Sequence, residues 1–391
     1  MEFIWYNPVV RQQKQSRKER KILMFKKKIA LMLVLAMVLC IVPFGAYATA
    51  ENTPATRIVT DMFDREVEIP YEVHSIVCLG SGAPRIAAYL QVTDMMVGAE
   101  DCDTGDVTVL RDYSWSHHEE LKDLPAVGSG GGSGQNNGYP EQIIELQPDV
   151  ILAGFSAEAA EELQAQTGIP VVSVRYFSKN FVDESFYQAT RVFAEVVGAE
   201  ERCEALLSFI DDCKADLAQR TSVYDDESKP TCYTGAVTFS GRHGFCGTYA
   251  NFGPFQAVSA LNVADEVPNV NYFETDFEQV LVWDPDVIFL DPGNMNLVND
   301  EYASNPNYFQ SVRAIQEGNV YTMPSFNNAG TNITYCLMDG YWVGMVLYPD
   351  AFADVTMDEI ADKVLTFMLG KNFYTDMVDG GLYYGNITIG E

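Results

Sequence analysis

Short apolar runs alternate with amphipathic segments over most of the chain from residue 75 onward. Apolar runs bounded by Gly, Pro or Asp are typical of strands buried in a parallel sheet, and apolar positions three or four apart are typical of helices. Strands are expected at 75–80, 95–100, 149–154, 169–174, 231–239, 286–291 and 319–324, and helices at 84–92, 140–147, 160–168, 277–283 and 312–318. An alternating segment at 51–70 predicts a β-hairpin in front of them. The pattern therefore predicts two groups of βαβ units.

One long segment between the two groups departs from this alternation. Residues 183–220 are helical in pattern throughout and contain a single glycine, Gly198. A helix or near-continuous helix pair of that length would reach about 50 Å, at 1.5 Å per residue. We therefore expect an α/β protein with two Rossmann-like lobes, each on a mainly parallel sheet, joined by one long α-helix and enclosing a ligand cleft. The expected bounds are 51–182 for the first lobe, 183–222 for the linking helix and 223–391 for the second lobe.

Two stretches 137 residues apart repeat the same sequence pattern. "PEQIIELQPDVILAG" begins at Pro140 and "FEQVLVWDPDVIFLD" begins at Phe277, and each carries Glu-Gln, an apolar stretch and Pro-Asp-Val-Ile. Proline ends the helix in both copies because the residue before it is pushed out of the α region. The repeat predicts an equivalent helix–turn–strand unit in each lobe. The alternative is that ordinary βαβ units have converged on these residues.

The amino terminus has the composition of an export signal. Nine Lys and Arg within residues 1–28 precede an apolar run at 29–46 and an Ala-Thr-Ala sequence that ends at Ala50. This order is typical of a secretory signal peptide, here 1–50, although an uncleaved anchor is the alternative. Met24 begins a complete signal by itself, so residues 1–23 are interpreted as an over-called start. Lipidation at Cys40 is disfavoured because a leucine, not a small residue, precedes it.

Removal of the signal leaves a strongly acidic chain. The first 50 residues hold nine of the 25 Lys and Arg and two of the 55 Asp and Glu, so the remainder has a net charge of about −37. Such a surface repels nucleic acid and anionic lipid. The seven remaining cysteines include no C-x-x-C pair, which indicates free thiols more than a disulfide framework.

The order and spacing of these segments resemble the helix-strut class of solute-binding proteins of ABC transporters, the exported receptors for ferric siderophores, haem and cobalamin. The resemblance covers residues 56–391 and is carried by "RIVTDMFDREVEIP", "SIVCLGSGAPRIAAYLQVTDMMVGAE", both repeats, the long helix and "AIQEGNVYTMP". It implies an exported, monomeric receptor of the cell envelope and not an enzyme. The implied cargo is an iron complex or a corrinoid, with no resident cofactor, delivered to a permease dimer with its ATPase.

The resemblance also implies a docking role for one acid in each lobe. In this family each lobe offers an acidic residue to basic pockets of the permease, and the matching positions are Glu141 and Glu278. The alternative is that both are ordinary acids, favoured at a helix N-terminus by the helix dipole. The segments 128–137, 238–255 and 326–352 depart from the enterobacterial pattern, so the resemblance defines the family and leaves the cargo open.

Ligands of doubly wound folds bind at the loops beyond the carboxyl ends of the strands. In these loops the few cations of the chain are interleaved with aromatic residues, a mixture that suits a large, anionic, partly apolar ligand. The candidate ligand contacts are Arg85, Arg111, Trp115, Arg175, Tyr176, Arg242, His243 and Tyr249. The alternative to ligand binding is that each arginine pairs with one of the many acidic residues and that each aromatic residue belongs to the hydrophobic core.

The same residues allow other kinds of ligand, and the motifs of the chain bear on whether it is an enzyme. A bare-metal site would need His117 or His118 together with His243, and an axial haem ligand would be His243 or Tyr249. A small oxyanion such as molybdate or tungstate, held by arginine and backbone N–H groups, is a further alternative. The chain has no G-x-S-x-G and no H-E-x-x-H motif, which disfavours an enzyme.

Overall fold

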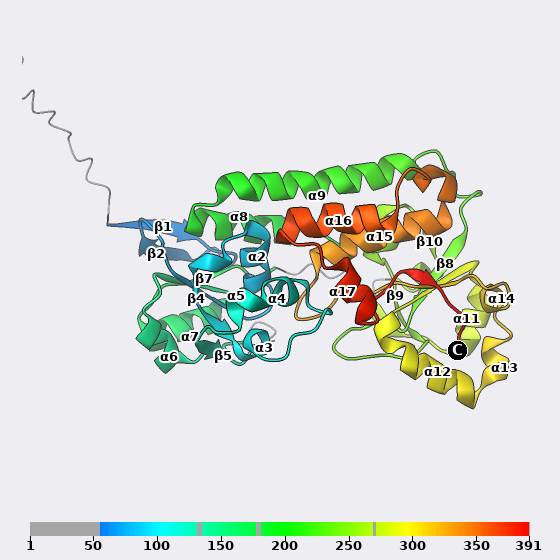
Figure 1. Cartoon of the computed structure of the whole chain (residues 1–391), viewed down its shortest axis with the longest axis horizontal. Coiled ribbons are helices and arrows are strands. Elements are labelled where there is room, and N and C mark those ends of the chain that lie inside the picture. Colours follow the sequence, from blue (N-terminus) through cyan, green and yellow to red (C-terminus); the bar gives the residue numbers. More distant parts are fainter. Residues whose placement is uncertain (1–54, 131–134, 177–180, 269–270, 391) are drawn as a thin grey trace, which may run out of the picture. The chain divides into compact units, whose positions relative to one another are not determined.

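The computed structural model describes residues 55–130, 135–176, 181–268 and 271–390 (Figure 1). The predicted signal peptide, the over-called start and Cys40 lie outside these residues. In the described part of the chain, no helix is both long and apolar enough to cross a membrane.

The first lobe contains the predicted hairpin and a five-stranded sheet. Strands β1 (Thr56–Thr60) and β2 (Glu66–Pro70) pair antiparallel, as predicted. The sheet has the order β5-β4-β3-β6-β7, and every pair in it is parallel. Its strands are β3 (Ile76–Leu79), β4 (Met96–Glu100), β5 (Ala126–Gly128), β6 (Val150–Ala153) and β7 (Val171–Ser173). Its helices are α2 (Ala83–Leu90), α3 (Asp101–Thr104), α4 (Asp112–Ser116), α5 (His118–Leu121), α6 (Pro140–Leu146) and α7 (Ala157–Thr167), with a 3-10 turn at Thr93–Met95.

The second lobe repeats this plan with an antiparallel edge. Its sheet has the order β10-β8-β12-β13-β14, parallel except for β14. The strands are β8 (Thr231–Gly235), β10 (Leu261–Asn262), β12 (Val287–Leu290), β13 (Val320–Thr322) and β14 (Gly385–Asn386), and β9 (Gly247–Tyr249) pairs separately with β11 (Tyr272–Glu274). The helices are α10 (Gly253–Ala257), α11 (Phe277–Trp283), α12 (Met295–Ser304), α13 (Pro306–Phe309), α14 (Arg313–Gln316), α15 (Ile333–Leu347), α16 (Met357–Leu369) and α17 (Tyr374–Asp379). Three 3-10 turns lie at Val263–Glu266, Pro292–Asn294 and Pro349–Phe352.

The linking segment differs from the predicted near-continuous helix of about 50 Å. It forms α8 (Glu184–Val197) and α9 (Glu200–Thr221), separated by Gly198, whose φ of 73° ends α8 in the left-handed conformation. The two helices fold back on each other, because Arg191 pairs with Glu204 at 3.0 Å and Tyr187 donates to Asp211 at 2.5 Å. Only α9, of 22 residues and therefore about 33 Å, runs from the first lobe to the second (Figure 1). The expected length was wrong because Gly198 turns the chain.

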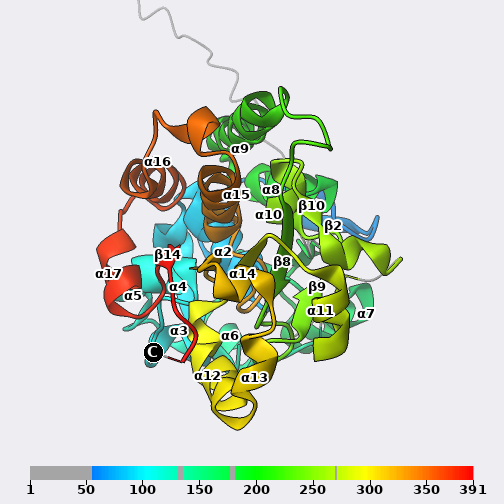
Figure 2. The ribbon, with the colours of Figure 1, turned by 90° about the vertical axis from the view of Figure 1, so that its right-hand side faces the viewer.

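Helices α15 and α16 lie against α9 and tie the two lobes together. Both α9 and α16 contact α15, and α16 also contacts α2 of the first lobe. The view along the linking helix shows α9, α15 and α16 as one helical layer beside the sheets (Figure 2). Residues of this layer, such as Leu206, Leu337 and Leu365, belong to the same buried apolar cluster as residues of the first sheet. The lobes therefore share a core instead of meeting only at a linker.

The repeated Pro-Asp pairs have one structural role in both lobes. Asp149 accepts hydrogen bonds from the backbone N–H groups of His74 and Ser75 at 2.7 and 2.9 Å, just before β3. Asp286 accepts from the N–H and the hydroxyl of Thr231, both at 2.8 Å, at the start of β8. In each lobe the carboxylate after the helix thus fixes the beginning of the neighbouring parallel strand. This shared task explains why the Pro-Asp part of the sequence recurs.

We predict that Asp149→Ala lowers the free energy of unfolding by about 1–2 kcal/mol, because two backbone N–H groups lose their acceptor. Urea unfolding followed by circular dichroism measures the loss. Glu145→Ala, on the exposed face of the preceding helix, is the matched control and should change stability by less than about 0.5 kcal/mol. Equal stability of the two variants would contradict the assigned role.

Candidate functional site

The two lobes meet at a buried arginine near the carboxyl ends of their strands. Arg85, on α2, has no exposed surface. Its Nε donates to Asp112 at 2.9 Å, and its Nη atoms donate to the backbone oxygens of Asn328 and Ala329 and to Oδ1 of Asn332, each at 2.9 Å. Arg85 was predicted to contact ligand from the cleft. The structure instead encloses it, and its described partners all belong to the protein.

The partners of Arg85 are themselves fully bonded. The second oxygen of Asp112 accepts from the hydroxyls of Tyr89 at 2.5 Å and Thr334 at 2.7 Å. Asn332, just before α15, donates to the carbonyl of Leu110 at 3.0 Å. Residues from the first lobe and from the start of α15 therefore form one buried polar network. We call Arg85, Asp112 and Asn332 the interlobe network.

Two further predicted residues reach across to the second half of the chain. Arg111 donates to the carbonyl of Cys102 at 2.8 Å and to Asp103 at 3.1 Å, and approaches Oδ1 of Asn328 at 3.4 Å. Trp115 donates its indole N–H to Asp376 of α17 at 3.1 Å. Both side chains therefore link the first lobe to segments more than 200 residues away in the sequence, at Asn328 and Asp376.

The end of β4 and the following helix α3 hold a largely buried group of potential metal ligands. Ligand atoms of Glu100, Cys102 and Asp103 all lie within 4.8 Å of one another. Burial raises the pKa of Glu100 to about 7, although the carboxylate accepts hydrogen bonds from the Gly80 N–H and from Asn137. Burial also raises the pKa of Asp103. Among the described residues this is the group that could hold a metal ion, and it contains none of the histidines proposed from the sequence.

The predicted residues of the second lobe lie around the ends of β8 and β12. Arg242 is exposed and donates to Oδ1 of Asn294 at 2.7 Å. His243 is bonded through both ring nitrogens, to the carbonyl of Phe239 at 2.9 Å and to the hydroxyl of Tyr272 at 2.6 Å. Tyr249 is buried, and its hydroxyl accepts from the Asn327 amide at 3.0 Å. His243 and Tyr249 therefore already have protein partners at the atoms that would bind a metal or haem iron.

The buried residue Asp291 directly follows β12. Asp291 accepts from the Thr238 hydroxyl at 2.8 Å and from the Gly293 N–H at 2.9 Å, and burial raises its pKa to about 6. It lines a small cavity of about 20 Å³ together with Tyr249 and Asn327. This cavity is too small for more than about one water molecule.

The last two predicted residues follow β7. Arg175 is partly buried just beyond the end of the strand. The centres of the Tyr176 and Phe186 rings lie 5.2 Å apart. Position 82 must be a glycine, because a Cβ atom on Gly82 would lie 2.5 Å from the Tyr176 ring. The Tyr176 hydroxyl is buried and forms no hydrogen bond with described residues.

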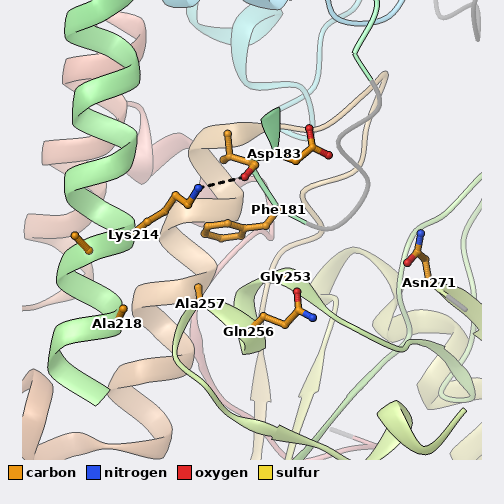
Figure 3. Close-up of a pocket in the computed structure, with 10 residues that line it drawn as sticks. Phe181, Asp183, Lys214, Ala218, Gly253, Gln256, Ala257 and Asn271 are labelled. Atoms are coloured by element: carbon orange, nitrogen blue, oxygen red, sulfur yellow. Dashed lines mark hydrogen bonds between the residues drawn. The ribbon is translucent and has the colours of Figure 1, made fainter. Parts of the chain in front are cut away.

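A larger groove opens between the lobes beside α9 (Figure 3). Its volume is about 740 Å³. The first lobe contributes Phe181 to Asp183, α9 contributes Lys214, Ala215 and Ala218, and the second lobe contributes Gly253, Gln256, Ala257 and Asn271. The small side chains on α9 and α10 leave the space open. We call this cavity the interlobe groove.

Lys214 provides the positive charge of the interlobe groove. Its ammonium group lies 3.5 Å from the Val182 carbonyl and 5.4 Å from the centre of the Tyr187 ring. Among the described residues it has no ion-pair partner within 4.0 Å. Figure 3 shows Lys214 extending from α9 toward the segment of Phe181, with Gln256 and Asn271 on the second-lobe side. The lining also contains the Asp183 carboxylate, so a cation, a carboxylate, two amides and an aromatic ring are available to a polar or charged solute.

None of the eight residues predicted from the loops lines the interlobe groove. The prediction followed the rule for strand ends, and it missed Lys214 because that residue lies in a linking helix. The available signal was a lysine among the small residues Ala215 and Ala218 on α9. Periodicity alone does not show which face of a linking helix borders a cavity.

The two predicted docking acids occupy equivalent places. Glu141 lies in the first turn of α6 and Glu278 in the first turn of α11, and both are exposed. Neither forms an ion pair within 4.0 Å with a described residue. Each is therefore available to a partner on the surface of its lobe.

Comparisons with known proteins agree with this architecture. The family model of the periplasmic binding proteins matches residues 76–326. The chain is 24% identical over 333 residues to the molybdate-binding protein MolA of Haemophilus influenzae, covering 79% of this chain and 89% of that protein. It is also similar to a periplasmic solute-binding protein from Veillonella parvula, with 18% identity, a TM-score of 0.63 and coverage of 84% and 97% of the two chains.

Two solved structures that contain a bound ligand are similar as well. Molybdate-bound MolA of Haemophilus influenzae shares 22% identity, with a TM-score of 0.60 and coverage of 81% of this chain and 99% of that chain. CeuE of Helicobacter pylori with Ni(II) bound shares 17% identity, with a TM-score of 0.57 and coverage of 81% and 97%. At these identities the two structures support the fold alone.

The chain belongs to the periplasmic binding protein family, in the helix-strut class of solute-binding proteins of ABC transporters. This confirms the family that the sequence resembles and its two α/β lobes. Members of the family bind solutes and are not enzymes, as expected for this chain.

We predict that Arg85→Met lowers the free energy of unfolding by about 3–5 kcal/mol, because Asp112 would remain buried without its counter-charge. Arg242→Met, at an exposed arginine that donates hydrogen bonds to Gly293, Asn294 and Asn296, should cost only about 1 kcal/mol, because no buried carboxylate loses its counter-charge there. Urea unfolding compares the two variants. If Arg85→Met were as stable as Arg242→Met, the interlobe network would not hold the lobes as described.

Proposed function

We propose that this chain is an extracytoplasmic receptor that captures an anionic solute in the interlobe groove and delivers it to the permease of an ABC importer. The observation that carries the proposal is the groove itself, because it lies between segments of both lobes and contains the Lys214 ammonium group, which has no ion-pair partner within 4.0 Å among the described residues. Membership of the family supports the extracytoplasmic location and the permease partner.

The dimensions of the groove favour a metal chelate as cargo. Its volume of about 740 Å³ lies in the range of cavities that hold small organic ligands. The Phe181 ring offers an apolar wall, and Lys214 offers a charge for a carboxylate or a catecholate oxygen. These features support an iron complex or a corrinoid, the cargo implied by the sequence, as the first candidate.

A tetrahedral oxyanion is the second candidate. The similarity to MolA, which covers 89% of that protein, favours molybdate or tungstate. Lys214 could donate a hydrogen bond to such an ion, whereas Asn271 lies on the far side of the groove (Figure 3). A bare metal ion at Glu100, Cys102 and Asp103 is a third possibility, which the positive charge of Arg111 beside Asp103 disfavours.

A ligand screen separates these candidates. The exported form is first screened by thermal shift against ferric chelates, haem, corrinoids, molybdate, tungstate and divalent metal ions. Calorimetry then measures the affinity of every compound that raises the melting temperature. Binding of a chelate or a corrinoid with micromolar or tighter affinity supports the first candidate. Binding of only the oxyanions supports the second. A cation that binds while no anion does would contradict the proposed anionic solute.

We predict that Lys214→Glu weakens the binding of an anionic solute at least tenfold, because attraction in the interlobe groove becomes repulsion. Calorimetry with the hit from the screen measures the change. Lys363→Glu carries the same charge change at an exposed site on α16 and is the matched control. It should alter the affinity less than twofold. Equal affinities of the two variants would place the solute outside the interlobe groove.

Docking on the permease is proposed to use Glu141 and Glu278. Each begins the helix of one sequence repeat, so each lobe offers one carboxylate at an equivalent position. A rim ion pair contributes at most about 1 kcal/mol, so each contact alone is weak. Two contacts on one rigid chain act together, because the first raises the effective concentration of the second.

We predict that Glu141→Ala and Glu278→Ala each lower uptake modestly, that the double change lowers it further, and that reversal to Arg lowers it most. Affinity for the solute should remain unchanged in every variant. Uptake and solute binding are measured side by side, with Glu145→Ala as the control on the same face of the first lobe. Normal uptake by the double variant would contradict the docking role, and both acids would then be ordinary residues of a helix N-terminus.

A further inference from the structure

His243 has a place in the structure that the proposed function does not use. It lies in the loop 236–246, which joins β8 to β9. Its ring contacts the ring of Tyr272 on β11, with centres 4.5 Å apart. A Cβ atom on Gly247 would lie 2.5 Å from the Cβ of His243, so the loop folds back closely onto the start of β9. His243 is therefore the point at which the loop contacts the β9–β11 pair.

Three polar atoms meet at one side of the His243 ring. Nδ1 lies 2.6 Å from the Tyr272 hydroxyl and 2.7 Å from Oε1 of Glu274. The Tyr272 hydroxyl also lies 2.5 Å from the same Oε1. At the other side of the ring, Nε2 lies 2.9 Å from the Phe239 carbonyl oxygen. We call His243, Tyr272 and Glu274 the His243 clasp.

These contacts determine how many protons the His243 clasp holds. The Phe239 carbonyl can only accept, so Nε2 carries a proton, and a neutral ring then leaves a bare lone pair at Nδ1. In that state Nδ1 and an ionised Glu274 would face each other at 2.7 Å with no proton between them, since the Tyr272 proton lies along one of the tyrosine's own bonds. With a further proton at Nδ1, the imidazolium donates to Glu274 and Tyr272 donates to the same carboxylate. The observed contacts therefore require one proton beyond those of a neutral ring, a phenol and a carboxylate.

Neighbouring groups leave this additional proton to His243 and Glu274. Burial and the hydrogen bond to Glu274 raise the pKa of Tyr272 above its ordinary value, so the hydroxyl remains a donor. The other titratable or charged groups around the clasp are Tyr249 of β9, Asp276 before α11, Asp291 after β12, Glu301 of α12, and Arg242 and Cys246 of the loop. The first five hydrogen-bond to groups outside the clasp. Burial raises the pKa of Cys246 to about 12, so its thiol stays neutral.

The loop that the clasp holds has a strained backbone. Ala236 and Ser240 have φ angles of 54° and 52°, in the left-handed region that residues with a Cβ rarely adopt. Such conformations persist only where surrounding contacts over-determine them. The ring of His243 supplies two of these contacts, one to Phe239 within the loop and one to β11. Loss of the additional proton would turn the contact with Glu274 from attraction into repulsion of lone pairs.

We propose that the His243 clasp is a pH-sensitive device. It fixes the loop after β8 to β11 while the additional proton is bound, and it releases the loop when that proton is lost as the pH rises. The residue before Tyr272 is Asn271, which lines the interlobe groove, so release also loosens this wall of the groove. That last step rests on the proposed function, whereas the clasp itself does not.

Nitrogen NMR of the exported form, labelled with ¹⁵N-histidine, follows the proton directly. His243→Gln assigns the signal among the four histidines. Between about pH 5.5 and 9, we expect His243 to pass from a ring protonated at both nitrogens to a neutral ring protonated at Nε2. This experiment gives the pH range in which the clasp loses its proton.

Trypsin then reports whether the loop is released, because Arg242 is exposed within it. The rate of cleavage after Arg242, divided by the rate on a free peptide of the same sequence at each pH, should rise at least about fivefold across that range. Glu274→Gln supplies an amide N–H that can donate to a neutral Nδ1, so this variant should keep the loop attached and change less than about twofold. Glu145→Gln makes the same substitution on the first lobe and should behave like the unmodified chain.

Three results would overturn the proposal: a cleavage rate that does not follow the His243 transition, equal pH dependence in the Glu274→Gln and Glu145→Gln variants, or a neutral His243 ring protonated at Nδ1. Neither measurement needs a solute, so both still report on the clasp if the proposed function fails. With a solute found in the screen, affinity should fall across the same pH range in the unmodified chain and not in Glu274→Gln. A constant affinity during release of the loop would overturn the link to the interlobe groove.

Discussion

Burial of the Arg85 guanidinium constrains how the two lobes can be arranged. A charged group without exposed surface must have its donors met by protein acceptors, because leaving them unpaired costs several kcal/mol. The acceptors come from Asp112 in the first lobe, from the backbone at Asn328 and Ala329, and from Asn332 before α15. Separating the lobes at this point would expose or orphan all of these groups together. The junction therefore favours one arrangement over a range of open ones.

The helical layer adds to this constraint. Helix α9 alone would be a slender connection, but α15 lies against it and α16 reaches α2 of the first lobe. Motion of the lobes would have to disturb this shared apolar core as well as the interlobe network. A solute is thus better accommodated by local adjustment around the interlobe groove than by wide opening. Small side chains on α9 and α10 provide space there without any movement of the lobes.

The sequence predicted most of the fold because its periodicities reflect local burial. The apolar runs at 76–79, 150–153 and 287–290 are strands with every residue buried, and the pattern identified each of them. The fold-back at Gly198 was missed, since a glycine within a helical pattern is compatible with both a kink and a full turn. Contacts between α8 and α9 distinguish the two, namely Arg191 with Glu204 and Tyr187 with Asp211.

The candidate site was harder to predict because side-chain burial depends on the other lobe. Arg85 and Trp115 lie in loops or helices near strand ends, as expected, but Arg85 also bonds Asn328 and Trp115 bonds Asp376, each more than 200 residues away. An arginine in such a loop can meet a solute or a protein acceptor with the same chemistry. Lys214 presents the opposite case, since the small residues Ala215 and Ala218 beside it are only a weak local signal and its environment arises where α9 runs from one lobe to the other.

The two sequence repeats show how one pattern serves both folding and recognition. Asp149 and Asp286 point inward and fix the starts of β3 and β8, a task that any unit of this geometry would need. Glu141 and Glu278 point outward and have no such task within their lobes. The structural requirement accounts for the Pro-Asp part of the repeat and leaves the Glu part unexplained. The helix dipole favours an acid at both positions, and a partner surface with one basic site for each lobe would favour the same residue, so the repeat alone does not separate the two reasons.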